Sequence, residues 1–505
     1  MGTAGSVAVS SALESASCGD LLAVIGLLQR QVEAAEARAE AAEARAERAE
    51  AQAAELAAAN ERLSARVAEL ERRLGRNSGN SLMPPSSDTF DRPERKPGPA
   101  SGRKRGRQPG AGEAGLAMAA DPDVTTDHLP AVCSGCGDAL GMRDRIGFER
   151  RQVRDIPLVT VTVTEHRAHR CRCACGRVTA RPMPGEIAGA PSSYGPNLRA
   201  LAVYLLVFQH IPVERTARLI KDVTGAEVST GWVACLLPEA EALVTDSLNL
   251  IQALLTMGHV LHADETTTRI GNVRHWLHVA CTDFLTLLHL APCSRAGVDA
   301  GGVLPHYRGV LVHHCLSLYA GYDACTHQLC GAHLIRELTA AEEDFPDQKW
   351  HQQIRWALAG LNRQAVRVRN REITEIAPAA LLLRHEAFHQ GITVGLSLHP
   401  KAPGRKQSPA HNLLRRLRDQ AHSILRFADD PLHVPFTNNC GERALRPVKT
   451  QLKISGCHQS EAGATARLNV RSYLDSARKH GLSAFEAIHR AFTGNLWMPP
   501  IEQTA

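Results

Sequence analysis

Apolar positions near the N-terminus follow a helical repeat. From about residue 21 to residue 76 the chain carries a helical pattern built from strong helix formers. Later in this segment the apolar residues recur at the 7-4-3-4 spacing of a coiled-coil seam. The seam comprises Leu56, Leu63, Val67, Leu70 and Leu74. The pattern predicts a coiled coil within residues 1–80 and hence a homo-oligomer; the alternative is a single solvated helix.

A second helical pattern covers residues 186–258. The stretch VERTARLIKDVTGAEVSTGWVACLLPEAEAL predicts a helix, a turn at Gly225, a cap at Ser229 or Thr230, and a second helix. This order is typical of a helix-turn-helix that contacts DNA. Helix pairs that only pack against a protein core have the same pattern, so both interpretations stay open.

Strand-like patterns begin at residue 259. The segments HVLHADETTTRI, VRHWLHVACTD, FLTLLHLAP and RGVLVHH predict three strands in hairpin succession and a fourth after a crossover. They indicate a mixed sheet of the ribonuclease-H-like type. Alternation places His262, Asp264 and Thr266 on one face of the first strand, and it sets His314 and His313 on opposite faces of the fourth. Taken alone, Asp264 would be a solvated acid at a strand end.

A second acid follows far downstream, in NNCGERALRPVKTQLKISG. Asn438 or Asn439 is expected to cap a helix whose first turn holds Glu442, and Pro447 is expected to kink that helix. Basic residues follow Glu442 on the same face. These are Arg446, Lys449 and Lys453. A carboxylate that leads a basic stripe suits a metal-bound phosphodiester whose neighbouring phosphates contact cations, although an ordinary salt-bridged helix surface has the same pattern.

The distribution of charge adds a further segment to this picture. The length of 505 residues predicts three or four domains, and the net charge is only +6. Basic residues nevertheless concentrate in a Pro- and Gly-rich linker at residues 81–126. That segment is typical of a flexible tether for an anionic polymer or of an arm that enters the DNA minor groove; the alternative is a merely soluble linker. The expected DNA-binding residues of the linker are Arg103, Lys104, Arg105 and Arg107.

Cysteine usage predicts a zinc site in residues 127–185. No apolar run is long enough to cross a membrane and no signal-peptide pattern begins the chain, so we expect a cytoplasmic protein with its fourteen cysteines reduced. Reduced cysteines in close pairs are typical tetrahedral zinc ligands. Two such groups flank a strand-like stretch at residues 152–170. The predicted ligands are Cys133, Cys136, Cys173 and Cys175, with Cys171 as a substitute; the alternative is free thiols in a small β module.

Together these segments carry a family resemblance that extends over nearly the whole chain. The chain resembles the insertion-sequence-sixty-six (TnpC-type) family of bacterial transposases. The matching motifs are NSGNSLMPPSSD, RGRQPG, the cysteine module, YGPNLRALAVYLLVFQHIPVERTARLI, HADETTTRI, CGAHLIREL, NNCGERALRPVKTQLKISG and RSYLDSARKHG. In combination they are highly specific.

The resemblance implies a DDE-type transposase with its catalytic acids on a ribonuclease-H-like core. Carried over by motif, Asp264 is the first acid, Glu442 is the third, and Cys330-x-x-His333 is a signature that precedes a helical insertion. Such proteins cut and join DNA at element ends with two Mg²⁺ ions, for which Mn²⁺ can substitute. The implied partners are the insertion-sequence ends, target DNA, other copies of the chain and element-encoded accessory proteins.

One departure from the family pattern affects the expected chemistry. The family has Val-His-Asp at the end of the fourth strand, whereas this chain has Val312, His313 and His314. His314 therefore stands in place of the second acid, and a neutral imidazole is a poor ligand for magnesium. Thr437, where the family usually has aspartate, is a less serious change. We expect a copy impaired in catalysis that still folds and binds DNA.

Other interpretations of position 314 stay open. Asp323 could supply the missing acid, the site could be a genuine variant that uses histidine, or one codon could be a sequencing error. The main alternative function is an oligomeric DNA-binding relic that occupies element ends without cutting. A weaker alternative is a zinc-dependent nucleic-acid regulator built on the cysteine module.

The predicted architecture is multidomain α+β. In order, it comprises a coiled-coil region (1–80), a basic linker (81–126), a small zinc-ribbon-like β module (127–185), a helical region resembling a helix-turn-helix (186–258), a ribonuclease-H-like α/β catalytic core (259–460) with a helical insertion at about 334–434, and a C-terminal helical tail (461–505).

Overall fold

A computed structural model describes residues 17–76, 80, 116–184, 189–404 and 406–501. By their internal contacts the residues form two units, 1–87 and 88–505. The predicted DNA-binding residues of the basic linker lie outside the described part of the chain. They are Arg103, Lys104, Arg105 and Arg107.

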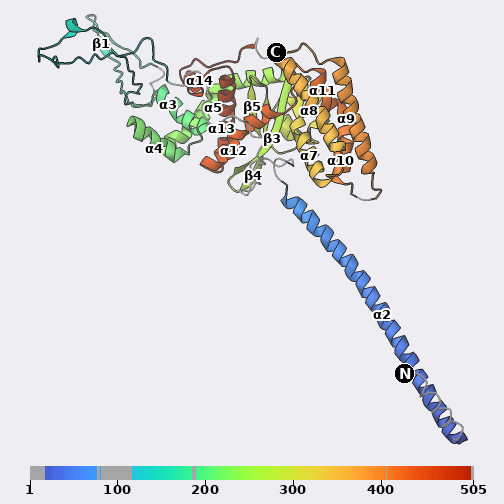
Figure 1. The fold of residues 1–505 in the computed structure, drawn as a ribbon. Helices are drawn as coiled ribbons and strands as arrows, with labels where there is room; N and C mark the ends of the chain where they lie inside the picture. Colours follow the sequence, from blue (N-terminus) through green and yellow to red (C-terminus); the bar gives the residue numbers. More distant parts are fainter. Residues whose placement is uncertain (1–16, 77–79, 81–115, 185–188, 405, 502–505) are drawn as a thin grey trace. The chain divides into compact units, whose positions relative to one another are not determined.

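The first unit is built around one continuous helix, α2 (Cys18–Leu74), 57 residues long (Figure 1). Its predicted seam is exposed: side chains from Leu56 to Leu74 retain between 43% and 86% of their accessible surface. A lone helix of this composition has no core of its own to bury these residues. The helix is therefore as predicted, and the seam remains available to another chain.

The cysteine module contains less β structure than the sequence predicted. Strand β1 (Arg170–Arg172) pairs antiparallel with β2 (Val178–Ala180), and a short 3₁₀ turn covers Met142–Asp144. Residues 152–169, which were expected to form a strand, have no regular secondary structure. Val153 and Leu158 in this stretch are more than nine-tenths exposed. The prediction of a long strand was wrong because alternation alone does not supply a partner strand or a core.

The helical region begins the compact part of the second unit. Gly225 ends α4 (Val213–Thr224) with a left-handed φ of 75°, and the Ser229 hydroxyl caps α5 (Thr230–Met257) by accepting from the Trp232 amide. Ten of the 28 residues of α5, from Val233 to Leu255, are buried, so the second helix of the pair packs one face into the core. It is preceded by α3 (Pro196–Val203) and a π-helical turn (Tyr204–Phe208).

A five-stranded mixed sheet follows, in the order β5-β4-β3-β6-β7. The first three strands along the chain are antiparallel neighbours, and β6 and β7 run parallel to β3. Four strands were predicted, and the short β7 was missed. The strands are β3 (Val260–Ile270), β4 (Val273–Cys281), β5 (Thr286–Leu290), β6 (Val310–His313) and β7 (Thr326–Leu329).

A helical insertion follows β7 and has a core of its own. Trp350, Ile354, Phe388 and Leu414 are buried in it, and the same cluster reaches the sheet through Leu329. Figure 1 shows these helices, in yellow to orange, beside the sheet. The helices are α7 (Gly331–Asp344), α8 (Trp350–Arg369), α9 (Pro378–Leu398), α10 (Pro409–Asp419) and α11 (Ala421–Asp429).

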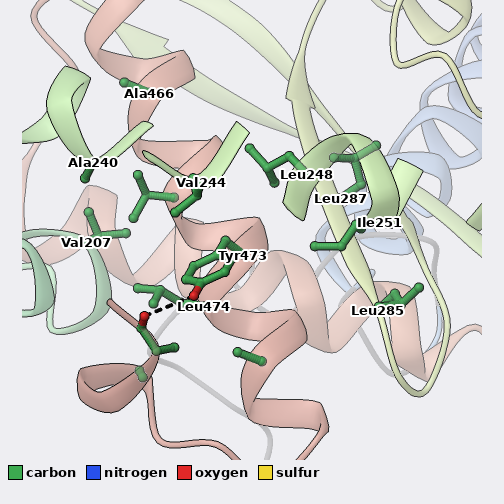
Figure 2. Close-up of a cluster of buried hydrophobic side chains, with 14 of the residues drawn as sticks. Val207, Ala240, Val244, Leu248, Ile251, Leu285, Leu287, Ala466, Tyr473 and Leu474 are labelled. Atoms are coloured by element: carbon green, nitrogen blue, oxygen red, sulfur yellow. Dashed lines mark hydrogen bonds between the residues drawn. The ribbon is translucent and has the colours of Figure 1, made fainter. Parts of the chain in front are cut away.

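Helices α13 (Glu461–Lys479) and α14 (Ala484–Phe492), which the sequence assigned to a C-terminal helical tail, contribute buried residues to the main core. The preceding helix, α12 (Asn439–Ser455), packs against β4 and β5 in a smaller cluster. Figure 2 shows Leu474 and Tyr473 of α13 among side chains of α5 and β5, with the Tyr473 hydroxyl donating to the Ala487 carbonyl. The β5 amides of Leu288 and Thr286 donate to α13 serine hydroxyls, each at 2.9 Å. Helix α13 therefore covers an edge strand whose amides would otherwise be unpaired.

Candidate active site

Strands β3 and β6 bring Asp264 and His314 together. Their parallel register pairs His262 with Val312, so Asp264 and His314, each two residues further, lie side by side. Asp264 is inside β3, which continues to Ile270, whereas β6 ends at His313. His314 is the first residue after β6. Its Nδ1 lies 3.4 Å from Asp264 Oδ1, and its Nε2 lies 2.9 Å from Glu265 Oε1. The histidine thus contacts two carboxylates.

This arrangement makes His314 a cation. Burial by itself lowers the pKa of the imidazole, but the close contacts with the Asp264 and Glu265 carboxylates and the attraction of their charges outweigh burial and raise the pKa to about 10. At neutral pH the position expected to hold an anionic metal ligand therefore carries a positive charge.

Stability is expected to fall as the pH rises above neutrality. An unfolded histidine has its ordinary pKa of 6.5, so the ion pairs contribute fully below that pH and lose their contribution as the pH rises towards 10. Between pH 6.5 and about pH 10, the loss of unfolding free energy approaches about 1.4 kcal/mol per pH unit. Urea unfolding from about pH 7 to about pH 9, followed by tryptophan fluorescence, should show this slope in the wild type and not in His314→Asn. Parallel curves for the two proteins would contradict the expected ion pair.

Glu265 is a residue of this site that the sequence did not predict. Its side chain is 6% exposed, its Oε1 contacts His314, and its Oε2 accepts a hydrogen bond of 2.7 Å from the Tyr319 hydroxyl. The only available signal was its place directly after Asp264 in HADET, and alternation argued that the two acids point apart. Both carboxylates nevertheless contact His314, because its ring lies beyond the end of β6, where both side chains can reach it.

Helix α12 carries the acid that the sequence predicted far downstream of Asp264. Glu442 lies in its first turn, with Oε1 3.9 Å from His333 Nδ1 and 3.9 Å from Arg336 Nη2. Among the described residues, no donor forms a hydrogen bond to this buried oxygen. Burial first, and then the charge of Asp264, raise the pKa of Glu442 despite the nearby arginines. The carboxylate is thus held in a site that lacks a full set of hydrogen-bond donors.

Backbone contacts fix α12 against β3. A side-chain cap from Asn438 was expected, but its side chain does not cap the helix. Instead, Asn438 Oδ1 lies in a 2.8 Å hydrogen bond with His262 Nδ1, and Asn438 Nδ2 donates to the Ala263 carbonyl at 2.9 Å. At Gly441 an added Cβ would lie 3.1 Å from the Asp264 Cβ, so the helix backbone closely approaches β3 at Asp264. These contacts place the elements that carry Asp264 and Glu442 next to each other.

The basic stripe of α12 begins close to the acids. Burial lowers the pKa of Lys449, while attraction to Asp264 and Glu442 acts in the opposite direction. The charge of Arg446 lowers the pKa of Glu442, and Lys453 lies in the last turn. Pro447 lies inside this helix, and the kink expected there stays a prediction.

Two sets of potential metal ligands meet in this region. Asp264, Glu265 and His314 form one, and Cys330, His333 and Glu442 form the other; in each set the ligand atoms lie within 4.8 Å of one another. Cys330 immediately precedes α7, and its sulfur accepts a 3.2 Å hydrogen bond from the Asn438 amide. Asp323, considered as a replacement acid, is exposed and belongs to no ligand group found among the described residues.

The cysteine module contains two thiol pairs on separate turns. Hydrogen bonds from the Cys136 and Gly135 amides and from the Cys136 side chain lower the pKa of Cys133. The Cys175 amide and side chain act in the same way on Cys173. A lowered pKa favours thiolate, the form that binds zinc, so the donors suit this metal. Within the described residues, the two pairs do not join into one ligand cluster.

Comparison with known families gives these features a common context. The model of the IS66 transposase family matches residues 191–466, more than half of the chain. The zinc-finger binding domain of IS66 transposases matches residues 130–176, which include both thiol pairs, and a family of unknown function matches residues 28–116. No curated protein matches the chain.

The matched domains define a transposase with a zinc finger. The chain belongs to the IS66 transposase family, as its motifs predicted. This membership supports a DNA-binding function in an insertion sequence and suggests zinc and a divalent metal as cofactors. Among the described helices, none is long and apolar enough to span a membrane.

Proposed function

We propose that this chain binds the ends of its insertion sequence but is impaired in cutting and joining DNA. In this proposal the sheet is a ribonuclease-H-like core, with Asp264 and Glu442 as the first and third metal-binding acids. The order of the strands and the approach of α12 to β3 support that assignment. The observation that carries the proposal is the ion pairing of His314, in the place of the second acid, with Asp264 and Glu265.

The physical argument concerns charge. Magnesium or manganese would activate water and then a 3′-hydroxyl for attack on phosphodiesters, and it requires hard anionic oxygen ligands. The carboxylates of Asp264, Glu265 and Glu442 are ligands of this kind, with Glu442 in a separate group from the other two, but the protonated His314 is not. It repels a cation and occupies both neighbouring carboxylates. With this set of ligands, the site as it stands does not support a metal-dependent cleavage step.

A second function, a DNA-binding relic that does not cut, is favoured by the same observation. Its DNA contacts would come from the zinc module, the basic linker and the stripe of α12. A DNA fragment that carries the element's own ends tests both functions in the presence of Mg²⁺ or Mn²⁺. Salt-dependent binding without strand cleavage or joining supports the proposal. Efficient cutting by the unaltered chain would show that the site is functional, and loss of both binding and cutting would contradict the retained DNA-binding role.

We further propose that Cys133, Cys136, Cys173 and Cys175 hold one zinc ion. Replacing Cys136 or Cys175 with serine is expected to reduce the zinc content of the purified protein by one ion per chain, because three ligands hold the ion far less tightly than four. The measurement is elemental analysis after dialysis.

Two further serine variants serve as controls for the zinc prediction. Cys235→Ser, at an exposed position on α5, should retain all of the zinc. Cys171→Ser should also retain it; if it instead loses the ion while Cys175→Ser does not, then Cys171 is the fourth ligand.

The exposed seam of α2 supports a homo-oligomer. Replacing Leu63 and Leu70 together with glutamate is expected to convert the oligomer into a monomer, because charges at core positions of a coiled coil cannot be buried. Sedimentation or light scattering measures the change. Ala58→Glu, at an exposed position off the seam, is the control and should leave the mass unchanged. A monomeric wild type would refute the proposal.

A further inference from the structure

A third group of metal-ligand side chains lies outside both the catalytic site and the zinc finger. It comprises His259, Asp430 and His433, whose ligand atoms all lie within 4.8 Å of one another. His259 directly precedes β3, while Asp430 and His433 follow α11 at the end of the helical insertion. The three residues therefore join two segments that are 171 residues apart in the chain.

The carboxylate of Asp430 is at the centre of the group. His259 Nε2 lies 3.3 Å from its Oδ2, and His433 Nδ1 lies 2.9 Å from its Oδ1. The two rings meet edge to face, with centroids 5.4 Å apart. Two imidazoles thus direct nitrogens towards one carboxylate, which is the donor set that proteins use for zinc and related transition metals.

The distances allow closure around an ion. Tetrahedral zinc with nitrogen ligands at about 2.0–2.1 Å places those ligands roughly 3.3 Å apart. Ligand atoms within 4.8 Å need to move by only about an ångström to reach this geometry. The histidine side chains are more than half exposed, at 55% and 57%, so they can rotate, and the ion would keep an open position for water.

The backbone on both sides of the group is already held in place. The His259 carbonyl accepts hydrogen bonds from the Tyr307 hydroxyl and the Val310 amide. On the other side, Arg369 donates to the carbonyls of Pro431 and Val434. Both segments are therefore positioned before any ion binds, which reduces the ordering required for metal binding.

We propose that His259, Asp430 and His433 bind a divalent transition-metal ion of the zinc type, which links the start of β3 to the end of the insertion. From this point the chain runs five residues to Asp264 on one side and nine residues to Glu442 on the other. The ion would thus join the two segments that lead to the proposed acids. The site is independent of position 314 and of whether the protein cuts DNA.

Cobalt(II) titration of the metal-free full-length protein tests this site. The wild type is expected to bind one more equivalent of cobalt than His433→Ala or Asp430→Asn. The wild-type minus variant spectrum should show visible d–d absorption without the thiolate charge-transfer band that the cysteine module would give. His389→Ala, which removes an exposed histidine on α9, is the matched control and should bind as the wild type does.

Equal cobalt stoichiometry in all four proteins would overturn the proposal and leave Asp430 as a hydrogen-bond acceptor only. A difference spectrum with a thiolate band would overturn it as well. Asp430→Asn keeps the size of the side chain, so it decides the outcome if His433→Ala is unstable before metal is added. Because the readout is metal binding alone, the result does not depend on the proposed loss of cleavage.

Discussion

The variant His314→Asp is expected to cut and join DNA carrying the element's ends about a thousandfold faster than the natural chain at pH 7 and limiting Mg²⁺. With a pKa of about 10, only about one His314 in a thousand is neutral at that pH, and a divalent ion must displace the proton before it can bind. Aspartate removes the competing cation and adds an anionic oxygen between Asp264 and Glu265. Single-turnover strand cleavage measures the effect.

Two further variants separate these contributions. His314→Asn removes the positive charge without adding an acid, so its rate should lie well below that of His314→Asp. If the two variants are equally fast, Glu265 already serves as the second acid and only the cation was harmful. Adding Glu442→Gln to His314→Asp should abolish cleavage, because one of the three acids is lost. A natural chain as fast as His314→Asp would refute the proposed impairment.

The sequence predicted much of this site because its parts lie on regular elements. The strand patterns place Asp264 within β3 and His314 directly after β6, and the cap-like asparagines before Glu442 indicate where α12 begins. The sequence motifs around the same acids are also sufficient to identify the family. Local periodicity and short motifs therefore predict the elements that carry the site.

The features that were missed depend on contacts between distant segments. Glu265 becomes part of the site only because His314 and Tyr319 reach it across the ends of the strands. Strand β7 is four residues long and is stabilised by the insertion: its Gln328 side chain accepts from the Phe427 amide. For residues 152–169 the sequence predicted a strand that does not form: the alternation is clear, but the structure gives these residues no partner strand. Pattern indicates what a segment could form, and tertiary contacts decide whether it does.

The C-terminal helices give the other large expected effect, this time on stability. Leu474 of α13 is fully buried among residues of α5 and the sheet (Figure 2). Leu474→Ala would leave a cavity in this core, and the expected loss is about 2–5 kcal/mol of unfolding free energy. A detachable tail would tolerate the same change with little effect, so the variant distinguishes the two descriptions of residues 461–505.

Tryptophan fluorescence during urea unfolding is a suitable measurement, because all five tryptophans lie between positions 232 and 497 and so outside α2. The matched control is Leu382→Ala on α9, where the leucine is 60% exposed and the same atoms are removed. The control should change stability by less than about 0.5 kcal/mol. If both variants unfold at the same urea concentration as the wild type, α13 is not part of the cooperative core. If only Leu474→Ala is destabilised, the helix that covers β5 is needed to hold the sheet on which Asp264 and His314 meet.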